Sequence, residues 1–294
     1  MKKKNTPMQL LVITSLNELT VDCSKNVKVG ELLKMILNKI HVAEEEYHYF
    51  TLTYEDADKT EKYLLHNKKL RRQVNNTEKS VQLKLKPFRY PEARTIPSLS
   101  NECLELLYVE MRNNIYNGKT SMTYNNLVTL LAVEWLVKDE NAKNENISIK
   151  FEKRLPVWVF KRYRQYSLKK WKHDIISMQN KLKQTHQICF HLKHYLLFAA
   201  TMTSYGETWF EWKNICFGLG YHGVHLYYSE NIQNPHFFSW QEMIDVKRTK
   251  MKVKMKIATQ LCLAKYNIRF ATKVDAKNFH WLCSTLKGLT NTIQ

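Results

Sequence analysis

The sequence predicts an α+β protein built of three successive parts. Apolar side chains recur with a period of two in residues 8–88 and again after Gly206, which is typical of strands, whereas residues 99–205 have helical spacing. At 294 residues, the chain is also longer than one hydrophobic core usually fills. Three of its six prolines fall within residues 86–100, so a boundary between compact parts is expected there.

The first part shows the pattern of two strands, one helix and three further strands. The pair Asn17-Glu18 separates the first two strands, as in a hairpin. The helix is expected because apolar residues fall on one of its faces, at Val29, Leu32, Leu33, Ile36, Leu37 and Ile40. The expected elements are strands over 10–15 and 19–23, a helix over 29–40, and strands over 47–54, 62–65 and 81–88. This is the order of a ubiquitin-like β-grasp.

The middle part predicts a helical bundle. Helices are expected over 99–116, 123–138, 155–166 and 168–205. Asn117-Gly118 ends the first helix and Tyr205-Gly206 the last, because glycine readily adopts the left-handed backbone that closes a helix. An acidic, Asn-rich loop is expected over 139–146.

The third part predicts short strands followed by one amphipathic helix. The strands are expected over 208–212, 215–219, 224–228, 237–246, 251–257 and 266–272. The helix is expected over 275–289, with one apolar face formed by Phe279, Leu282, Cys283 and Leu286. Strands closed by a C-terminal helix are the outline of a pleckstrin-homology (PH) or phosphotyrosine-binding (PTB)-like sandwich.

Local motifs spread over essentially the whole chain are similar to those of one family. They are Asn67-Lys68-Lys69, Phe88-Arg89-Tyr90-Pro91-Glu92, His194-Tyr195-Leu196 followed by Tyr205-Gly206, Leu219-Gly220-Tyr221-His222-Gly223-Val224-His225-Leu226-Tyr227, and Phe238-Ser239-Trp240-Gln241-Glu242-Met243. In this order they resemble the three-lobed FERM domain of the band four-point-one, ezrin/radixin/moesin and merlin proteins.

The resemblance implies both architecture and function. It implies a ubiquitin-like first lobe over 1–92, an all-helical bundle like acyl-CoA-binding protein over 93–206, and a PH/PTB-like β-sandwich with its C-terminal helix over 207–294. It also implies a non-enzymatic adaptor or scaffold that docks at the cytoplasmic face of the plasma membrane. Its expected partners are phosphoinositides and other anionic phospholipids, cytoplasmic tails of transmembrane proteins, and other scaffold or cytoskeletal proteins.

Some features depart from the family pattern. The turn at Lys213-Asn214 is short, and the strand expected near Lys250 to Lys256 is unusually basic. The chain ends directly after the last helix, so an actin-binding tail of the ezrin type is not expected. One alternative is therefore a regulatory FERM module cut from a larger tyrosine phosphatase, kinase or motor.

The net charge points to anionic partners. There are 46 Lys and Arg residues against 27 Asp and Glu, a formal charge of +19, which attracts phosphates, anionic lipids or acidic protein tails. A second alternative is charge-driven RNA binding. Specific nucleic-acid recognition is not expected, because RNA-binding proteins interleave exposed aromatics with basic residues and the aromatics here fall at inward positions.

Lysines at two places are candidates for binding a phosphoinositide headgroup. The resemblance implies this role for Lys68 and Lys69 in the first lobe and for Lys277 on the last helix. Further basic clusters occur in the sequence, one of them at residues 161–172. The proposed secondary basic surface comprises Arg71, Arg72, Lys250, Lys252, Lys254 and Lys256. In the strand expected near Lys250 to Lys256, the lysines alternate with apolar residues, so that they would line one face. The alternative to a lipid-binding surface is a solvated face that protects a sheet edge.

A peptide groove is expected between the fifth strand of the third lobe and the C-terminal helix. The resemblance to PTB-like sandwiches implies an unpaired edge over 245–249, to which an extended peptide could add as a strand. The candidate groove residues are Val246, Lys247, Arg248, His280 and Ser284. The alternative is an edge that is solvated or covered by another segment.

No pattern in the sequence indicates an enzyme, a metal or a cofactor. Gly218, Gly220 and Gly223 satisfy G-x-G-x-x-G, but a strand rather than a helix follows, which argues against a dinucleotide site. His186, His191 and His194 lack the further ligands that structural zinc requires. The six cysteines form no CxxC pair, as is typical of reduced thiols in a cytosolic protein.

The sequence also predicts where the protein resides. Lys2, Lys3 and Lys4 followed by an apolar run imitate a signal peptide, but no small-residue cleavage site follows, and a strand explains the run equally well. No window supplies 18 uncharged apolar residues, so no membrane-spanning helix is expected. A soluble cytoplasmic protein, peripheral at the plasma membrane and cell cortex, is the expectation.

Overall fold

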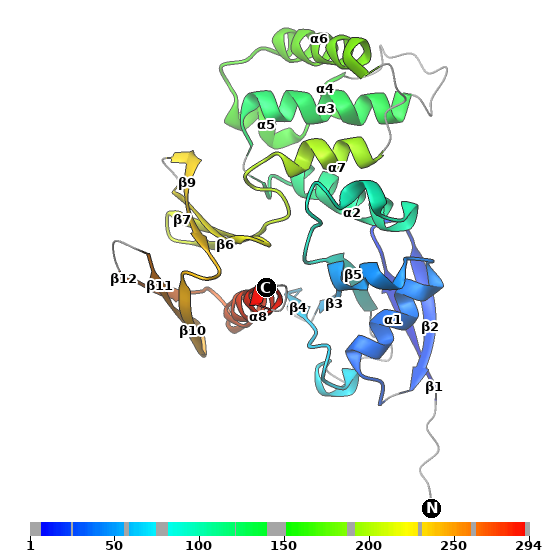
Figure 1. Cartoon of the computed structure of the whole chain (residues 1–294), viewed down its shortest axis with the longest axis vertical. Coiled ribbons are helices and arrows are strands. Elements are labelled where there is room, and N and C mark those ends of the chain that lie inside the picture. The colour runs from blue at the N-terminus through cyan, green and yellow to red at the C-terminus, as the bar shows by residue number, and fades with distance from the viewer. Residues whose placement is uncertain are drawn as a thin grey trace, which may run out of the picture. The chain divides into compact units, whose positions relative to one another are not determined.

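The chain forms two compact units in the computed structural model (Figure 1). The structure describes residues 7–24, 26–55, 59–74, 82–120, 122–139, 151–186, 192–228, 231–259 and 263–291. The first unit comprises Met1–Tyr90, Ser100–Leu106 and Gly206–Gln294. The second unit comprises Pro91–Leu99 and Leu107–Tyr205.

The first unit begins with a five-stranded sheet and a helix that packs on it. The elements are β1 (Pro7–Ile13), β2 (Glu18–Ser24), α1 (Val29–Lys39), η1 (Glu44–Tyr49), β3 (Phe50–Glu55), β4 (Glu61–Tyr63), η2 (Leu70–Arg72) and β5 (Gln82–Pro87). The strand order is β2-β1-β5-β3-β4, in which β1 and β5 are parallel and the other pairs are antiparallel. The predicted apolar face of α1 is buried, and the apolar run near the N-terminus is β1.

One expected strand begins later than the sequence pattern indicated. Residues 44–49 form the 3-10 helix η1, and β3 starts at Phe50 instead of at residue 47. The carboxylate of Glu46 accepts a bond of 3.3 Å from the amide of Ala43 and one of 2.6 Å from the amide of Ser100. Glu46 is only 4% exposed, so this buried carboxylate fixes the turn that replaces the start of the strand.

The second unit contains the helical segment. Its elements are η3 (Ile96–Ser98), α2 (Asn101–Tyr116, whose first turns belong to the first unit), α3 (Tyr124–Asp139), α4 (Phe151–Arg154), α5 (Val157–Arg162), α6 (Leu168–His186) and α7 (Leu192–Ala200). The helix expected over 155–166 is shorter, because α5 starts after its N-cap residue Pro156 and ends at Arg162; the short helix α4 before it was not expected. The helix expected over 168–205 contains both α6 and α7, and α7 ends at Ala200. Most of the expected acidic loop lies outside the described residues.

The rest of the first unit is a sandwich of two sheets closed by a helix. β6 (Thr208–Trp212), β7 (Ile215–Leu219), β8 (Gly223–Tyr228) and β9 (Asn231–Ser239) form one sheet in that order. β10 (Met243–Thr249), β11 (Lys252–Ala258) and β12 (Leu263–Arg269) form the other, and α8 (Lys273–Asn291) follows. Phe217, Trp240 and Phe279 are buried in the common core. The lobe boundaries expected at 92 and 206 remain a proposal.

The single strand expected over 237–246 is wrong, because two strands of different sheets occupy it. The side chain of Glu242 accepts hydrogen bonds from the amide of Ser239 at 2.7 Å and from its hydroxyl at 2.8 Å, which closes a turn. The buried indole of Trp240 donates to the carbonyl oxygens of Gly220 at 3.1 Å and Tyr221 at 2.9 Å. The chain therefore crosses from β9 to β10 around the fixed side chain of Trp240.

Candidate functional site

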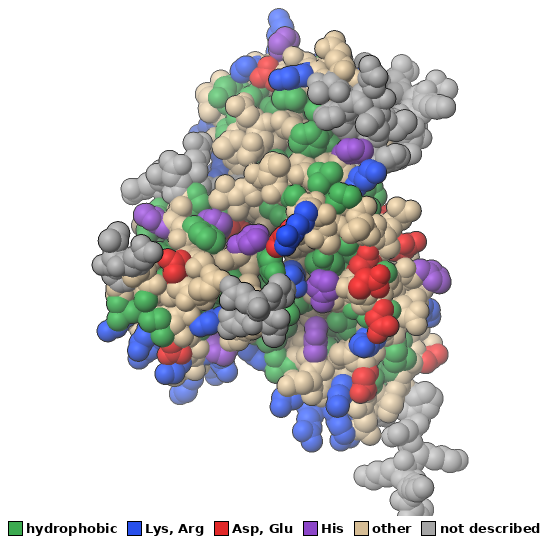
Figure 2. Space-filling view, in the orientation of Figure 1, with side chains coloured by type: hydrophobic (Ala, Val, Ile, Leu, Met, Phe, Trp, Pro, Cys, Tyr) green, Lys and Arg blue, Asp and Glu red, His purple; other side chains and the backbone are tan. Residues whose placement is uncertain are grey.

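Basic side chains gather at the turn that follows β4. We call the residues Lys28, Lys68, Lys69, Arg71 and Arg72 the basic turn. An isolated bridge joins Lys28 to Lys69, and the carbonyl oxygen of Lys68 accepts a bond of 3.0 Å from the amide of Val29 at the start of α1. Figure 2 shows Lys and Arg side chains at the lower edge of the first unit, where this turn lies. The expected lipid ligands Lys68 and Lys69 thus stand beside three other cations.

Hydrogen bonds to main-chain groups hold the basic turn in place. The side-chain amide of Gln73 donates to the carbonyl of Leu65 at 2.9 Å, and its oxygen accepts from the amide of Leu65 at 2.7 Å. The amide of Gly30 donates to the carbonyl of His66 at 3.0 Å. The turn is therefore a preformed part of the fold, in which Lys28 and Lys68 are exposed and Lys69 is half-buried.

Lys277 belongs to a second group of cations in the same unit. Partial desolvation, followed by the positive charges of Lys62 on β4 and Arg248 on β10, lowers the pKa of Lys277. We call Lys62, Arg248 and Lys277 the seam cluster. An anion bound between these three side chains would relieve their mutual repulsion. The sequence indicated Lys277, but Lys62 and Arg248 join it only through the fold.

The seam cluster lies where α8 packs against β4. Asn278, which is 6% exposed, donates from its side-chain amide to the carbonyl of Glu61 at 2.7 Å and accepts from the amide of Tyr63 at 3.3 Å. It therefore pairs with the main chain of β4 much as a neighbouring strand would. The ring of Trp281 stacks on that of Tyr63, with centroids 4.9 Å apart and planes 20° apart. We call this contact the α8–β4 seam.

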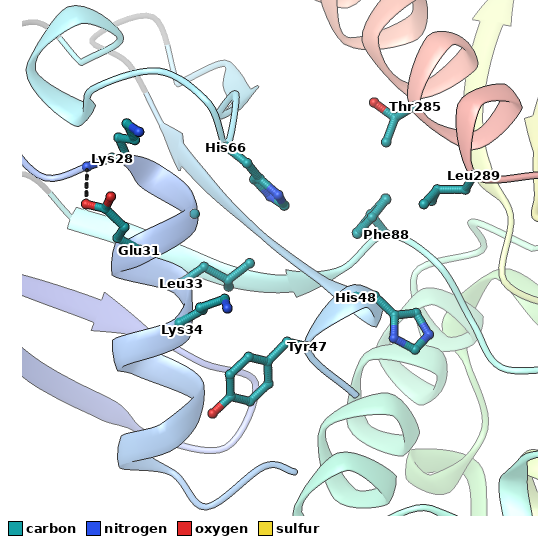
Figure 3. A pocket seen from close by; sticks show the side chains of 11 residues that line it. Lys28, Glu31, Leu33, Lys34, Tyr47, His48, His66, Phe88, Thr285 and Leu289 are labelled. Carbon is teal, nitrogen blue, oxygen red and sulfur yellow. Dashed lines mark hydrogen bonds between the residues drawn. The ribbon is translucent and has the colours of Figure 1, made fainter. Parts of the chain in front are cut away.

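A pocket of about 520 Å³ opens between α1 and α8 in the first unit (Figure 3). Its apolar wall includes Leu33 from α1, Phe88 after β5 and Leu289 from α8. Lys28 and Lys34 stand along α1, and Lys34 pairs with the exposed Glu44 at 3.4 Å. The sequence analysis did not find this pocket, because its lining comes from segments far apart in the chain.

Two histidines give the pocket polar but uncharged groups. Burial lowers the pKa of His66, whose Nε2 lies 3.1 Å from the hydroxyl of Thr51. Burial and then the charge of Arg89 lower the pKa of His48, whose Nδ1 donates to the carbonyl of Glu45 at 2.6 Å. Since an unperturbed histidine titrates at about 6.5, both rings are neutral at pH 7.

The expected groove residues come together on β10 and α8. β10 is an edge strand of its sheet and packs against α8, and the ring of His280 bonds the main chain of Val246. At the other end of the strand, Lys287 donates to the carbonyls of Met243 and, at 3.2 Å, Ile244. Side chains of α8 therefore already occupy part of this edge. The hydroxyl of Ser284 turns back to the carbonyl of His280 at 2.8 Å.

The basic strand is the central strand of its sheet. Lys252, Lys254 and Lys256 are exposed on β11 and alternate with buried Val253, Met255 and Ile257. Because β11 lies between β10 and β12, these lysines do not protect a sheet edge. Lys250 lies in the turn before β11 with a φ of 49°, so it is not part of the strand. The face also carries Lys247, Lys265 and Arg269 in register with them.

The described residues hold no metal-ligating cluster, and the glycine motif has a packing role. The glycines of the G-x-G-x-x-G match serve packing: a Cβ on Gly218 would lie 2.2 Å from Oε2 of Glu207, and one on Gly223 would lie 2.0 Å from the carbonyl oxygen of Phe238. No group of three metal-ligating side chains occurs in this part of the chain, and His191 lies outside it. The described cysteines are free thiols. None of the described helices has the length and apolar run needed to cross a bilayer.

One family model matches the first part of the chain. Residues 15–76 match the model of the FERM N-terminal domain. These residues include α1, Lys68, Lys69 and the rest of the basic turn. No curated protein sequence matches the chain significantly.

Solved structures extend the likeness to nearly the whole chain. The FERM and C-terminal domain complex of Drosophila Merlin matches with a TM-score of 0.74 at 17% identity, covering 96% of each chain. A Myosin VII MyTH4-FERM domain of Dictyostelium discoideum matches with a TM-score of 0.69 at 12% identity, covering 96% of this chain and 61% of that one. The human Myosin 7b C-terminal MyTH4-FERM domain, solved with a harmonin PDZ domain, gives 0.70 at 12% identity and covers 97% and 60%.

Proposed function

We propose that this chain, which has the fold of a FERM domain, is a non-catalytic adaptor that docks on the cytoplasmic face of the plasma membrane. It binds phosphoinositide headgroups through Lys68, Lys69 and Lys277, and it binds cytoplasmic tails of membrane proteins at the groove between β10 and α8. The observation that carries the proposal is the seam cluster, in which partial desolvation and then two cations of other elements, Lys62 on β4 and Arg248 on β10, lower the pKa of Lys277. A polyvalent phosphate is the ligand that such a cluster favours.

The basic surfaces of the first unit support this proposal. The basic turn adds five cations on a backbone that internal hydrogen bonds hold in place. The exposed lysines of β11 extend the cationic surface, and Figure 2 shows Lys and Arg side chains gathered where β10 and β11 lie. Each lysine or arginine near an anionic membrane contributes about 1 kcal/mol, so several acting together give stable attachment.

Liposome binding tests the lipid part of the proposal. The triple variant Lys68→Glu, Lys69→Glu and Lys277→Glu should lose binding that depends on phosphatidylinositol bisphosphate without a lower melting temperature. Exposed charges contribute little to folding, and the change at Lys277 removes a charge that Lys62 and Arg248 repel. The matched control replaces the exposed lysines Lys39, Lys59 and Lys213 by Glu, which changes the net charge equally. Equal loss in both variants, or no loss in the first, would contradict this site.

The alternatives predict different results in the same assay. Charge-driven RNA binding predicts that a single-stranded RNA competes with the vesicles and that phosphoinositide adds nothing over phosphatidylserine. A regulatory module of a larger protein is also compatible with the fold, since the chain spans about three fifths of the myosin chains it matches. The division into lobes 1–92, 93–206 and 207–294 is proposed on the same basis.

A further inference from the structure

The second unit carries an exposed patch that combines apolar and basic side chains. On α5, Val157 is 85% exposed and Phe160 is 42% exposed. Lys161 is exposed beside them, and positions i, i+3 and i+4 share one face of a helix. Large apolar side chains on a monomer surface are common singly, but two neighbours beside a lysine on one short helix form a local patch.

The opposite face of α5 anchors the patch. Val159 is fully buried, and the indole of Trp158 donates to the carbonyl of Ile115 at 2.7 Å. Arg162 stands over the ring of Trp158 at 5.6 Å. The inward residues therefore fix the helix, so that Val157 and Phe160 have no place in the core. Their exposure follows from how α5 is packed.

Further cations follow the two apolar side chains in the sequence. Arg164 is exposed just after α5, and Lys169 and Lys172 are exposed in the first turns of α6. No described residue forms an ion pair with any of these three or with Lys161. Lys170 differs, because it is held by Asp174 at 2.9 Å. Residues 157–172 therefore offer four exposed cations without an ion-pair partner among the described residues, and one of them, Lys161, shares the face of α5 that carries Val157 and Phe160.

We propose that Val157, Phe160, Lys161, Arg164, Lys169 and Lys172, here called the α5 patch, form a second membrane-docking surface. The apolar side chains enter the boundary between headgroups and acyl chains, and the cations bind anionic headgroups of the same leaflet. This rests on the proposed membrane function but names a different surface, on the other unit, and a different kind of lipid contact. Charge complementarity selects an anionic bilayer, and the exposed apolar pair favours a bilayer over a nucleic acid or an acidic peptide.

Two double variants separate the electrostatic contribution from the apolar one. Vesicles of phosphatidylcholine alone and of equal parts phosphatidylcholine and phosphatidylserine, without phosphoinositide, are used for sedimentation. Lys161→Glu with Arg164→Glu should weaken partitioning onto the anionic vesicles by at least about 30-fold, because two cations are lost. Val157→Ser with Phe160→Ser should weaken it by about tenfold while leaving the net charge unchanged.

Controls match each change elsewhere on the chain. Lys39→Glu with Lys59→Glu alters the charge equally, and Met35→Ser with Leu263→Ser removes apolar side chains that are 43% and 53% exposed. Both controls should retain wild-type partitioning to within a few-fold. Far-UV circular dichroism and Tm establish that each variant is folded. If the serine pair fails to fold, a single Phe160→Ser variant replaces it.

The outcomes distinguish this inference from the proposed function. Patch variants that partition like the wild type, or controls that weaken as much as they do, overturn the α5 patch. Normal vesicle binding combined with lost binding of a fluorescent single-stranded RNA would make the surface a nucleic-acid site and also overturn it. If the wild type binds phosphoinositide vesicles and the patch variants partition onto anionic vesicles as the wild type does, the α5 patch is wrong and the proposed function stands. A wild-type chain that binds no anionic vesicle would overturn the proposed function as well.

Discussion

Lys277 is the residue of the proposed lipid site whose ionisation is most affected by its surroundings. Its pKa is lowered by desolvation and by Lys62 and Arg248. Below the lowered pKa, the native state carries the charge at a free-energy cost that the unfolded chain does not have. As pH rises through that value toward the usual lysine range of about 10.4, the native state loses the proton first and stability rises. The seam cluster therefore opposes folding at neutral pH until an anion binds.

Replacement of Lys277 by Met tests this balance. At pH 7 the variant should have a higher Tm than the wild type, because a charge repelled by two neighbours is removed. The difference should shrink as pH rises into the lysine range, and inositol trisphosphate should raise the Tm of the wild type more than that of the variant. Calorimetry measures both effects. A variant that is less stable at pH 7, or equally stabilised by the ligand, would show that Lys277 does not act this way.

Glu207 illustrates which residue roles the sequence could not reveal. Its buried carboxylate pairs with His225 and accepts bonds from the hydroxyl of Tyr227 at 2.6 Å and the indole of Trp209 at 3.1 Å. Gly218 stands between Trp209 and His225 in the ladder, and its missing side chain leaves room for the carboxylate. The sequence showed that Gly218 was no nucleotide-binding glycine, but its packing role depends on strand register.

Most elements follow from hydrophobic periodicity, and the exceptions have local causes. The helix at 29–40 and the hairpin strands near 208–219 appear within about two residues of their expected ends. The β9 to β10 crossing was missed because Trp240 is apolar and continues the strand pattern, although its indole bonds to Gly220 and Tyr221 make it a pivot. The helix expected over 155–166 was drawn too long, because apolar residues continue past Arg162, where α5 ends; the four-residue helix α4 before Pro156 was not expected.

The basic turn and the groove differ in how far the sequence could predict them. Four of the five residues 68–72 are lysines or arginines, so their grouping needs no tertiary information. The groove required the correct edge strand, and β10 is indeed at an edge. The sequence could not show that His280 and Lys287 already bond to the main chain of β10. A peptide that adds to this edge has to displace these side chains.

A proline at Val246 tests strand addition at β10. Proline removes a backbone donor and disfavours a neighbouring strand, so a receptor-tail peptide that binds the wild type should lose at least about tenfold in affinity. Isothermal titration with the folded variant measures the effect. Val246→Ala serves as a control that keeps the amide, and it should bind almost as the wild type does. Equal affinity of the proline variant would exclude strand addition at this edge.

At the scale of the whole molecule, the α8–β4 seam joins segments that the sequence separates by more than 200 residues. Asn278 bonds to Glu61 and Tyr63, and Trp281 stacks on Tyr63. As a result, the β-grasp sheet and the strand sandwich belong to one compact unit, although their strands form separate sheets. No periodicity or motif predicts such a contact, because a buried asparagine can be recognised only once its partners are known.

Asn278→Ala tests whether the seam makes the first unit unfold cooperatively. The change removes two hydrogen bonds and leaves the amide of Tyr63 and the carbonyl of Glu61 without this partner in a poorly hydrated place, so a loss of about 2 to 4 kcal/mol is expected. Urea unfolding followed by tryptophan fluorescence and by far-UV circular dichroism measures it. In the wild type, both probes should report the same transition for this unit, whereas the weakened seam should allow them to separate.

Ser284→Ala is the matched control for the seam, because Ser284 lies on the same helix and its hydroxyl bonds only within that helix. Its unfolding midpoint should stay within about 0.5 kcal/mol of the wild type. If Asn278→Ala behaves like this control, the seam adds little to stability, and other contacts couple the β-grasp to the strand sandwich. If the two probes separate already in the wild type, the β-grasp and the sandwich unfold independently. The seam cluster would then be assembled only by the ligand that it binds.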